Sequence, residues 1–203
     1  MRLHEAKKDH YRKLAKEEGY RSRSAYKLMQ IDQKYKIIKR GFYVLDFGAA
    51  PGGWLEVLSK RITNKGLAIG IDIKAIEYVS ENVITLECDI NDSNFVKDIK
   101  HVTEDEFDLI LSDIAPNVTG MWEVDQSVQI DLTEKIIFTF DRLMKKNGNA
   151  VLKVFEGTKL SQLEKTLKNK FRQIRRFKPP ASRGASSEMY LICIGFHKSR
   201  LMK

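Results

Sequence analysis

The chain has 203 residues, of which 42% are hydrophobic and 31% are charged, a composition that suits a single soluble globular domain. No apolar run approaches the roughly 20 residues that a membrane helix needs, and the first 21 residues are too charged to hold the apolar core of a signal peptide. We therefore expect a cytoplasmic protein with no membrane partner.

The net charge of +9 is unevenly distributed along the chain. Residues 1–40 carry 13 basic and 5 acidic side chains, residues 41–152 carry 10 and 19, and residues 153–203 carry 13 and 3. Basic ends around an acidic centre are typical of a protein that binds a polyanion, most commonly RNA or DNA. The alternative is that these charges form solvated helix faces.

The N-terminal 40 residues predict a basic arm followed by a helix. Residues 2–18 are rich in Lys and Arg. Ser22 or Ser24 can cap a helix through "AYKLMQIDQKYKI", in which Leu28 and Ile31 share one face.

From residue 41 onward, apolar strand-like runs alternate with helical segments. The predicted strands are 42–47, 66–73, 83–90, 107–114, 149–155 and 188–196. The predicted helices are 52–63, 126–146 and 158–170. This alternation indicates an α/β fold with a mostly parallel sheet covered by helices on both faces. In such sheets, ligands bind outside the carboxyl ends of the strands.

A glycine-rich turn, "LDFGAAPGGW" (45–54), follows the first strand. A phosphate-binding P-loop would need Gly-Lys-Ser/Thr at the start of the helix, and Gly53-Trp54-Leu55 has neither the lysine nor the hydroxyl. The dinucleotide pattern GxGxxG is also unmet by "GAAPGG". ATP and dinucleotides are therefore disfavoured, although the turn remains typical of a cofactor site.

Acidic residues stand where a phosphate-free cofactor would need them. Asp46 precedes the turn, and Asp72, Asp89 and Asp113 end the next three strands. S-adenosylmethionine combines an adenosine, a ribose and a cationic centre without phosphate. Asp72 can accept from the ribose hydroxyls and Asp89 from the adenine amino group, while Asp46 and Asp113 place negative potential near the cationic groups. Each aspartate alone is also explained as a turn or cap residue.

Three further charges interrupt apolar strands. Lys153 lies inside "VLKVF", where an unpaired lysine is costly, and Glu188 begins "EMYLICIGF". If the last strand is antiparallel, Glu188 meets Asp113 and Lys153 at one edge, and Lys27 from the preceding helix completes an alternating cluster. Lys27 and Glu188 also suit solvated surface positions.

Five ordered blocks resemble the signatures of the FtsJ/RrmJ (RlmE-type) family of RNA 2′-O-ribose methyltransferases. The blocks are "SRSAYKL" (22–28), "DFGAAPGGW" (46–54), "SDIAPNVTG" (112–120), "VLKVFEG" (151–157) and "SSEMYL" (186–191), within a similarity that spans about residues 20–196. The resemblance implies a single-domain Rossmann-like S-adenosylmethionine-dependent fold with a seven-stranded, mostly parallel sheet and an antiparallel last strand. The domain is expected over 21–197, after a basic arm (1–20) and before a short tail (198–203).

The resemblance also implies the site residues. The family's catalytic tetrad matches Lys27, Asp113, Lys153 and Glu188. Its cofactor contacts carry over to Gly52, Gly53, Trp54, Asp72, Asp89 and Asp113, with Gly48 and Pro51 shaping the turn.

A ribose hydroxyl must lose its proton as it attacks the methyl carbon. Lys153 is the candidate base, provided that desolvation and Lys27 lower its proton affinity, while Asp113 and Glu188 orient the reacting groups. Stabilisation of the developing alkoxide by a charged Lys153 is the alternative. We expect no metal, because the four histidines are scattered, and we expect Cys88 and Cys193 to be buried thiols.

The substrate is expected to be RNA, bound by the basic flanks. The run "KNKFRQIRRFK" (168–178) supplies phosphate contacts together with Arg21, Arg23, Lys34, Lys36, Lys39 and Arg40. The loop "PPASRGASS" (179–187) is expected to close over a nucleotide.

Several functions remain open. Large-subunit ribosomal RNA, modified at a uridine by a monomer, is the first expectation, and tRNA or a cap-adjacent mRNA nucleotide follows. A non-catalytic RNA-binding ribosome-assembly factor and a nicotinamide-dependent oxidoreductase are the other classes.

Overall fold

The structure is a computed structural model that describes residues 3–116, 119–182 and 186–197, with side chains from His10 onward. The tail 198–203 and parts of the 112–120 and 179–187 loops lie outside these residues.

Seven strands of the described chain form one sheet in the order β3-β2-β1-β4-β5-β7-β6. The strands are β1 Tyr43–Phe47, β2 Leu67–Asp72, β3 Val83–Glu87, β4 Phe107–Ser112, β5 Met144–Phe155, β6 Phe171–Phe177 and β7 Glu188–Phe196. The strands from β3 to β5 pair in parallel, and β7 inserts antiparallel between β5 and β6. The predicted sheet, with its antiparallel last strand, is confirmed.

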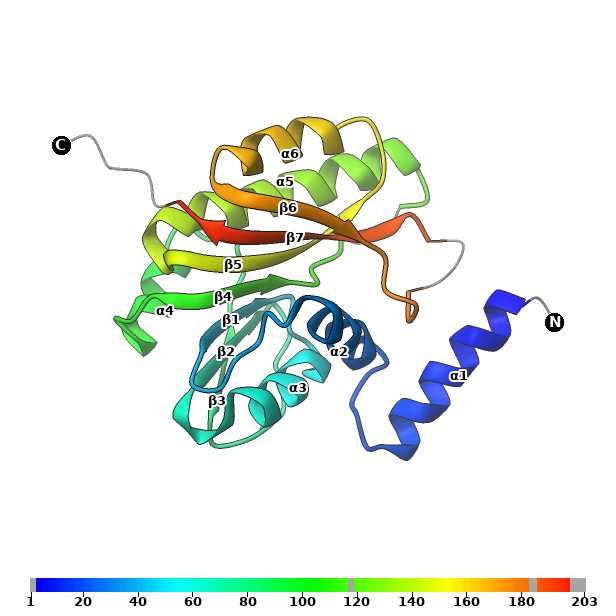
Figure 1. The fold of residues 1–203 in the computed structure, drawn as a ribbon, viewed down its shortest axis with the longest axis horizontal. Helices are drawn as coiled ribbons and strands as arrows, with labels where there is room; N and C mark the ends of the chain where they lie inside the picture. Colours follow the sequence, from blue (N-terminus) through cyan, green and yellow to red (C-terminus); the bar gives the residue numbers. More distant parts are fainter. Residues whose placement is uncertain (1–2, 117–118, 183–185, 198–203) are drawn as a thin grey trace.

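Helices cover both faces of the sheet. They are α1 Leu3–Glu17, α2 Ser24–Tyr35, α3 Gly53–Ile62, the short 3₁₀ helix Thr63–Lys65, α4 Phe95–Val102, α5 Trp122–Leu143 and α6 Leu160–Lys168. In Figure 1, α5 and α6 lie on one side of the sheet, and α2 and α3 lie on the other.

Successive side chains of a strand point to opposite faces of the sheet, so the apolar strands build a hydrophobic core on each face. Leu45 and Phe47 of β1 pack in the cluster that includes α4, α5 and α6, whereas Val44, directly before Leu45, packs in the cluster that includes α2 and α3. All three side chains are fully buried. The sheet is therefore covered on both faces, as its apolar strands predict.

The helices and strands differ from the sequence expectation at several places, and α5 begins at Trp122 rather than at residue 126. The helix predicted to 146 ends at Leu143, because Lys145 and Lys146 belong to an irregular start of β5 where the pairing with β4 shifts. Helix α4 and strand β6 were not predicted. Strand β6 was not predicted because it lacks the apolar run that marked the other strands. It lies at the edge of the sheet, where its charged side chains are exposed to solvent.

The N-terminal arm is helical and contacts the body of the protein. Ala15 of α1 is buried in a small cluster with Tyr26 of α2 and Ala181. α2 begins at Ser24, but no side-chain hydrogen bond caps it among the described residues. Instead, the hydroxyl oxygens of Ser22 and Ser24 lie 2.5 Å apart, so the expected serine cap is wrong.

Among the described helices, none combines the length and apolar character required to cross a membrane.

Two phenylalanines of α5 give a matched test of the core. Phe140 is fully buried and packs edge-on against Phe171 and Phe196, whereas Phe138 is 81% exposed. We expect Phe140→Ala to lower the free energy of unfolding by about 3–5 kcal/mol. Phe138→Ala should change it by less than about 0.5 kcal/mol, measured by urea titration. Equal effects would contradict this description of the core.

Candidate active site

The structure brings the four predicted tetrad residues together from four elements. Asp113 directly follows β4, Lys153 lies in β5, and Glu188 begins β7, where it pairs with Phe155 at the end of β5. Lys27 comes from α2. The antiparallel direction of β7 is what brings Glu188 to the carboxyl edge of the parallel strands.

The tetrad forms two linked ion pairs. Lys153 Nζ lies 3.1 Å from Asp113 Oδ1 and also donates to the backbone carbonyl of Asp113. Lys27 Nζ pairs with Glu188 Oε1. The lysine side chains are only 8% and 7% exposed, so each ammonium group depends on its carboxylate partner.

Tyr190 joins the two pairs and was missed by the sequence analysis. Its hydroxyl lies 2.7 Å from Asp113 Oδ1 and 3.1 Å from Glu188 Oε1, and Lys27 Nζ lies 5.7 Å from its ring centroid. Residues two apart in a strand face the same side, so its spacing from Glu188 was the available signal.

The charges around Asp113 and Tyr190 fix their protonation. Burial acts to raise the pKa of Asp113, but the ammonium groups of Lys153 and Lys27 and the Tyr190 hydroxyl outweigh it and lower that pKa below its ordinary value. Burial, together with the charges of Asp113 and Glu188, raises the pKa of Tyr190 well above its ordinary value. Asp113 is therefore a carboxylate at neutral pH, and Tyr190 remains a hydrogen-bond donor.

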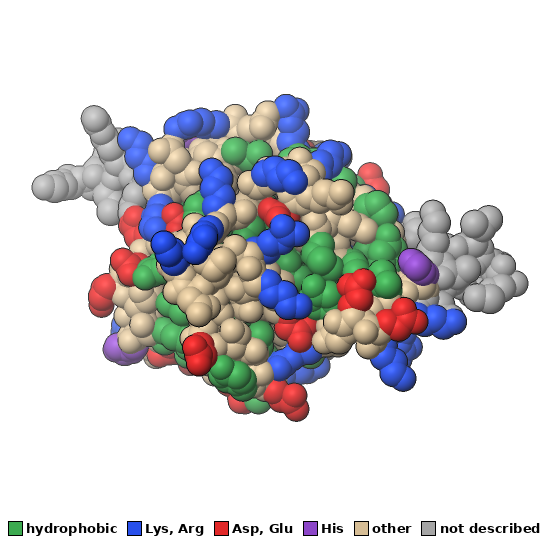
Figure 2. Space-filling view, turned by 60° about the horizontal axis from the view of Figure 1, so that its bottom comes forward, with side chains coloured by type: hydrophobic (Ala, Val, Ile, Leu, Met, Phe, Trp, Pro, Cys, Tyr) green, Lys and Arg blue, Asp and Glu red, His purple; other side chains and the backbone are tan. Residues whose placement is uncertain are grey.

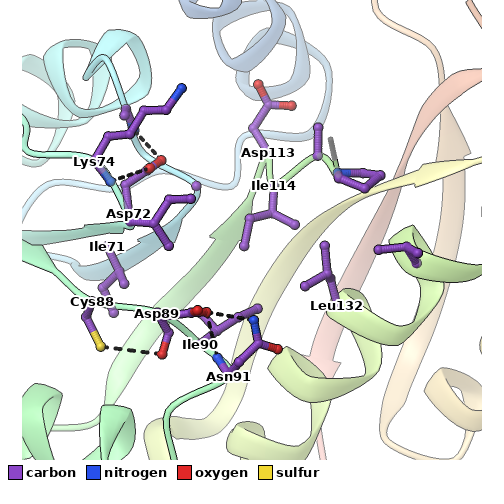
Figure 3. A pocket seen from close by; sticks show the side chains of 16 residues that line it. Ile71, Asp72, Lys74, Cys88, Asp89, Ile90, Asn91, Asp113, Ile114 and Leu132 are labelled. Carbon is purple, nitrogen blue, oxygen red and sulfur yellow. Dashed lines mark hydrogen bonds between the residues drawn. The ribbon is translucent and has the colours of Figure 1, made fainter. Parts of the chain in front are cut away.

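A pocket of about 460 Å³ opens beside the tetrad, with Asp113 in its lining. Figure 3 shows Asp72 and Asp89 on one side of this space and Ile114 and Leu132 on the other. The lining also includes Gly48, Ala50 and Asn91. The pocket thus combines carboxylates at the strand ends with apolar walls.

Asp72 and Asp89 are held in place by local hydrogen bonds. Asp72 accepts from the backbone N–H groups of Ala50 and Lys74 at 2.9 and 3.0 Å. Asp89 accepts from the backbone and side chain of Asn91 at 2.8 and 2.7 Å. Asp72 ends β2 as predicted, whereas Asp89 lies two residues beyond the end of β3.

Gly48 allows the glycine turn to approach the strand end beside the pocket. Its φ of +76° suits glycine, and a Cβ there would come within 2.8 Å of the Ile114 backbone. This close approach, the fixed carboxylates and the apolar walls fit an adenosine-type cofactor without phosphate groups.

The other predicted turn residues lie behind the pocket rather than in its described lining. A Cβ on Gly53 would come within 2.2 Å of Ser22 Oγ, so this glycine admits the segment before α2. Trp54 is 2% exposed, and its indole N–H donates to the Ser24 carbonyl at 2.8 Å. Pro51 and Gly52 face Arg21, which lies 3.4 Å from the Pro51 carbonyl.

Arg21, predicted to contact RNA phosphates, uses its guanidinium group for contacts within the protein. Its guanidinium donates to the carbonyls of Pro51, Glu77 and Tyr78, and its Nε lies 3.4 Å from Glu56 Oε1. Arg21 therefore ties the glycine turn to α3 and to the segment after β2.

Asp46, which the sequence analysis expects to act electrostatically, does not line the pocket. Asp46 is fully buried within β1, outside the pocket lining, and neither of its carboxyl oxygens has a hydrogen-bond partner among the described residues. Burial, followed by the charges of Asp113 and Asp72, raises its pKa well above the ordinary value. Both its burial and the neighbouring carboxylates therefore act against a charged Asp46.

Both cysteines were predicted to be buried thiols, and this is confirmed for Cys193 only. Cys193 is a buried free thiol, whereas Cys88 is half-buried and lines the pocket. The described residues include no group of three or more His, Cys, Asp or Glu side chains that could hold a metal ion.

Basic side chains are spread over one face of the molecule. In Figure 2, Lys and Arg side chains are scattered over the upper half and centre of this face, and acidic side chains lie at its left and lower edges and to the right of its centre. On the edge strand β6, Arg172, Arg175 and Arg176 are exposed. Arg176, however, forms a bidentate pair with Glu164 at 2.6 and 2.7 Å, which reduces its value as a phosphate contact.

The chain is similar in sequence and in structure to known ribosomal RNA methyltransferases. The chain is 44% identical over 196 residues to a protein of Nitrosopumilus maritimus named ribosomal RNA large subunit methyltransferase E, covering 97% of this chain and 99% of that one. It is 39% identical to a Cenarchaeum symbiosum protein of the same name, with 97% and 99% coverage. A solved Plasmodium falciparum structure described as a ribosomal RNA methyltransferase is 31% identical, has a TM-score of 0.79, and covers 87% of this chain and 98% of its own.

The profile of the FtsJ-like methyltransferases matches residues 20–196, nearly all of the described fold. The methyl donor of this family is S-adenosylmethionine, which the pocket beside the tetrad fits. The chain belongs to the FtsJ-like methyltransferase family.

Proposed function

We propose that the protein methylates a ribose 2′-hydroxyl of RNA, using S-adenosylmethionine as donor. The observation that carries this proposal is the buried cluster of Lys27, Asp113, Lys153 and Glu188 beside the pocket. Such a cluster can orient a hydroxyl group and move its proton without a solvated base.

The cofactor residues follow from the pocket. Asp72 and Asp89 would hold the ribose and the adenine amino group, and Asp113 would lie near the cationic end. Gly52, Gly53 and Trp54 stand at the start of α3, outside the pocket lining, so their proposed role is to shape the turn next to the cofactor. When bound, S-adenosylmethionine supplies a methyl group activated by a sulfonium centre.

Lys153 is the proposed acceptor of the ribose proton. It is 5% exposed and lies between Asp113 and the apolar residues of β5. It would accept the proton that the ribose hydroxyl loses when the methyl group moves from the sulfonium sulfur to the ribose oxygen, and Asp113, which also accepts from Tyr190, would hold the lysine in place. Lys27 and Glu188 complete the charge balance around the oxygen.

Ribosomal RNA of the large subunit is the proposed substrate, because the relatives that share 44% and 39% identity carry that substrate in their names. A uridine is the proposed target nucleotide, as the family resemblance implies. tRNA is the second candidate. All residues of the site come from one chain, so we propose an active monomer that works on RNA in the cytoplasm.

The substrate class can be tested by offering three RNAs to the protein with a labelled methyl donor. Deproteinised large-subunit rRNA, bulk tRNA and intact large ribosomal subunits should be compared. We expect label in rRNA, either free or within the subunit, and none in tRNA. Label confined to tRNA would reject the proposed substrate, and no label in any RNA would reject the function.

Two substitutions separate a base from a fixed charge at position 153. Lys153→Ala should lower turnover by about 10²–10⁴-fold, because the ribose proton loses its acceptor. Lys153→Arg keeps the charge but cannot release a proton, so it should be similarly impaired. Binding of S-adenosylmethionine, measured by calorimetry, should persist in both. Turnover close to normal in Lys153→Arg would make the residue an electrostatic stabiliser instead.

Tyr190→Phe should lower kcat by about 10–150-fold, because Asp113 and Glu188 lose the hydroxyl that bridges them. The affinity for S-adenosylmethionine should stay unchanged. Tyr26→Phe is the matched control, since it removes a tyrosine–carboxylate hydrogen bond to Glu18 outside the cluster. If the two variants have the same kcat, Tyr190 has no special role.

Arg175→Glu tests the basic surface without breaking the Arg176–Glu164 pair. RNA affinity should fall by about 3–10-fold at low salt, and the slope of affinity against salt should become shallower by about 1–2. Lys97→Glu on α4 makes the same charge change elsewhere. Filter binding at several salt concentrations measures both, and equal losses in the two variants would contradict a localised RNA surface.

A further inference from the structure

An exposed apolar surface lies at the start of α5. Met121 is 62% exposed, Trp122 46%, Val124 42% and Val128 40%. Trp122, Val124 and Val128 line one groove of about 680 Å³ together with Gly157 and Lys159. Large apolar side chains gathered in one exposed groove are typical of a binding surface.

Trp122 and Phe155 form an aromatic ledge in this region. Their ring centroids lie 5.7 Å apart, with the planes inclined by 36°. The loop after Phe155 packs tightly on α5, because a Cβ on Gly157 would come within 1.8 Å of the Gln126 amide. Gln126 is itself 5% exposed, so this contact anchors the loop and α5 to each other beside the ledge.

The aromatic ledge adjoins the active site. Phe155 ends β5 two residues after Lys153 and pairs with Glu188 in the sheet. Val128 lines both the groove and the pocket that contains Asp113. A strand of RNA whose ribose reaches Lys153 can therefore place a neighbouring nucleotide close to Trp122.

We propose that the aromatic ledge stacks the unpaired base of a nucleotide next to the methylated ribose. The inference rests on the proposed function and adds the way in which the RNA is positioned. Unstacked bases of single-stranded RNA bind preferentially on aromatic side chains, whatever their sequence. The ledge thus acts as a positioning surface for the target strand.

Charge in the groove favours a base rather than a run of phosphates. Lys159, whose Nζ lies 2.7 Å from Ser127 Oγ, offers one cation, but Glu123 lines the same groove. The two charges offset each other, so stacking must supply most of the affinity here. Phosphate attraction comes instead from the basic surface that includes Arg175.

Fluorescence offers a readout that does not depend on methyl transfer. The chain has two tryptophans, and Trp54 is buried at 2% exposure whereas Trp122 is exposed. A single-stranded oligouridylate should quench tryptophan emission of the wild-type protein, and the quench should disappear in Trp122→Phe. Absence of quenching at a concentration where the oligonucleotide is bound, as judged by anisotropy of a fluorescein label, would overturn the inference.

Affinity supplies the second measurement. Trp122→Ala should weaken oligouridylate binding about 5- to 150-fold, the range typical of one stacked base, and Trp122→Phe should stay within about 5-fold of wild type. Phe138→Ala, which removes another exposed aromatic residue of α5 about 24 Å further along the helix, should have no effect. Unchanged affinity for S-adenosylmethionine verifies that each variant is folded.

The outcomes separate the inference from the proposed function. If the wild-type protein methylates RNA and Trp122→Ala does so with an unchanged KM for RNA, the inference fails and the groove is better explained as a protein-docking surface. If Trp122→Ala loses RNA affinity while the wild-type protein methylates no RNA, the inference stands and the proposed function fails.

Discussion

The cost of burying two lysines governs the rest of the site. An ammonium group removed from water is strongly destabilising unless a carboxylate lies beside it, and both Lys27 and Lys153 are almost fully covered. Asp113 and Glu188 meet this requirement, and the Tyr190 hydroxyl ties the two pairs into one network. Loss of any member leaves a buried group without its partner.

The topology of the sheet brings the members of this network together. Parallel strands alone would bring Asp113 and Lys153 to one edge, but Glu188 and Tyr190 reach it only because β7 runs the other way between β5 and β6. Lys27 arrives from α2, whose preceding segment is held against the glycine turn by Arg21 and by the close packing at Gly53. The turn and the cluster are thereby coupled through one short stretch of chain.

Much of this arrangement could be predicted from sequence, because charged residues in apolar strands are conspicuous. Lys153 and Glu188 stood out for that reason, and the ends of parallel strands located Asp72, Asp89 and Asp113. Tyr190 was not singled out, since a tyrosine in a strand usually signals packing and one of its hydroxyl partners, Asp113, comes from a distant segment. The bonds of Arg21 to three carbonyls and the full burial of Asp46 likewise depend on tertiary contacts that local patterns do not encode.

The identity of the methylated atom tests the central claim most directly, because the cluster is arranged to act on a hydroxyl group. RNA labelled by the protein should be digested to nucleosides and analysed by mass spectrometry, with alkaline hydrolysis in parallel. The label should appear in a 2′-O-methylnucleoside and in alkali-resistant dinucleotides, since the methylated oxygen can no longer attack the neighbouring phosphate. Label in a base-methylated nucleoside, with ordinary sensitivity to alkali, would contradict the role given to the buried lysines.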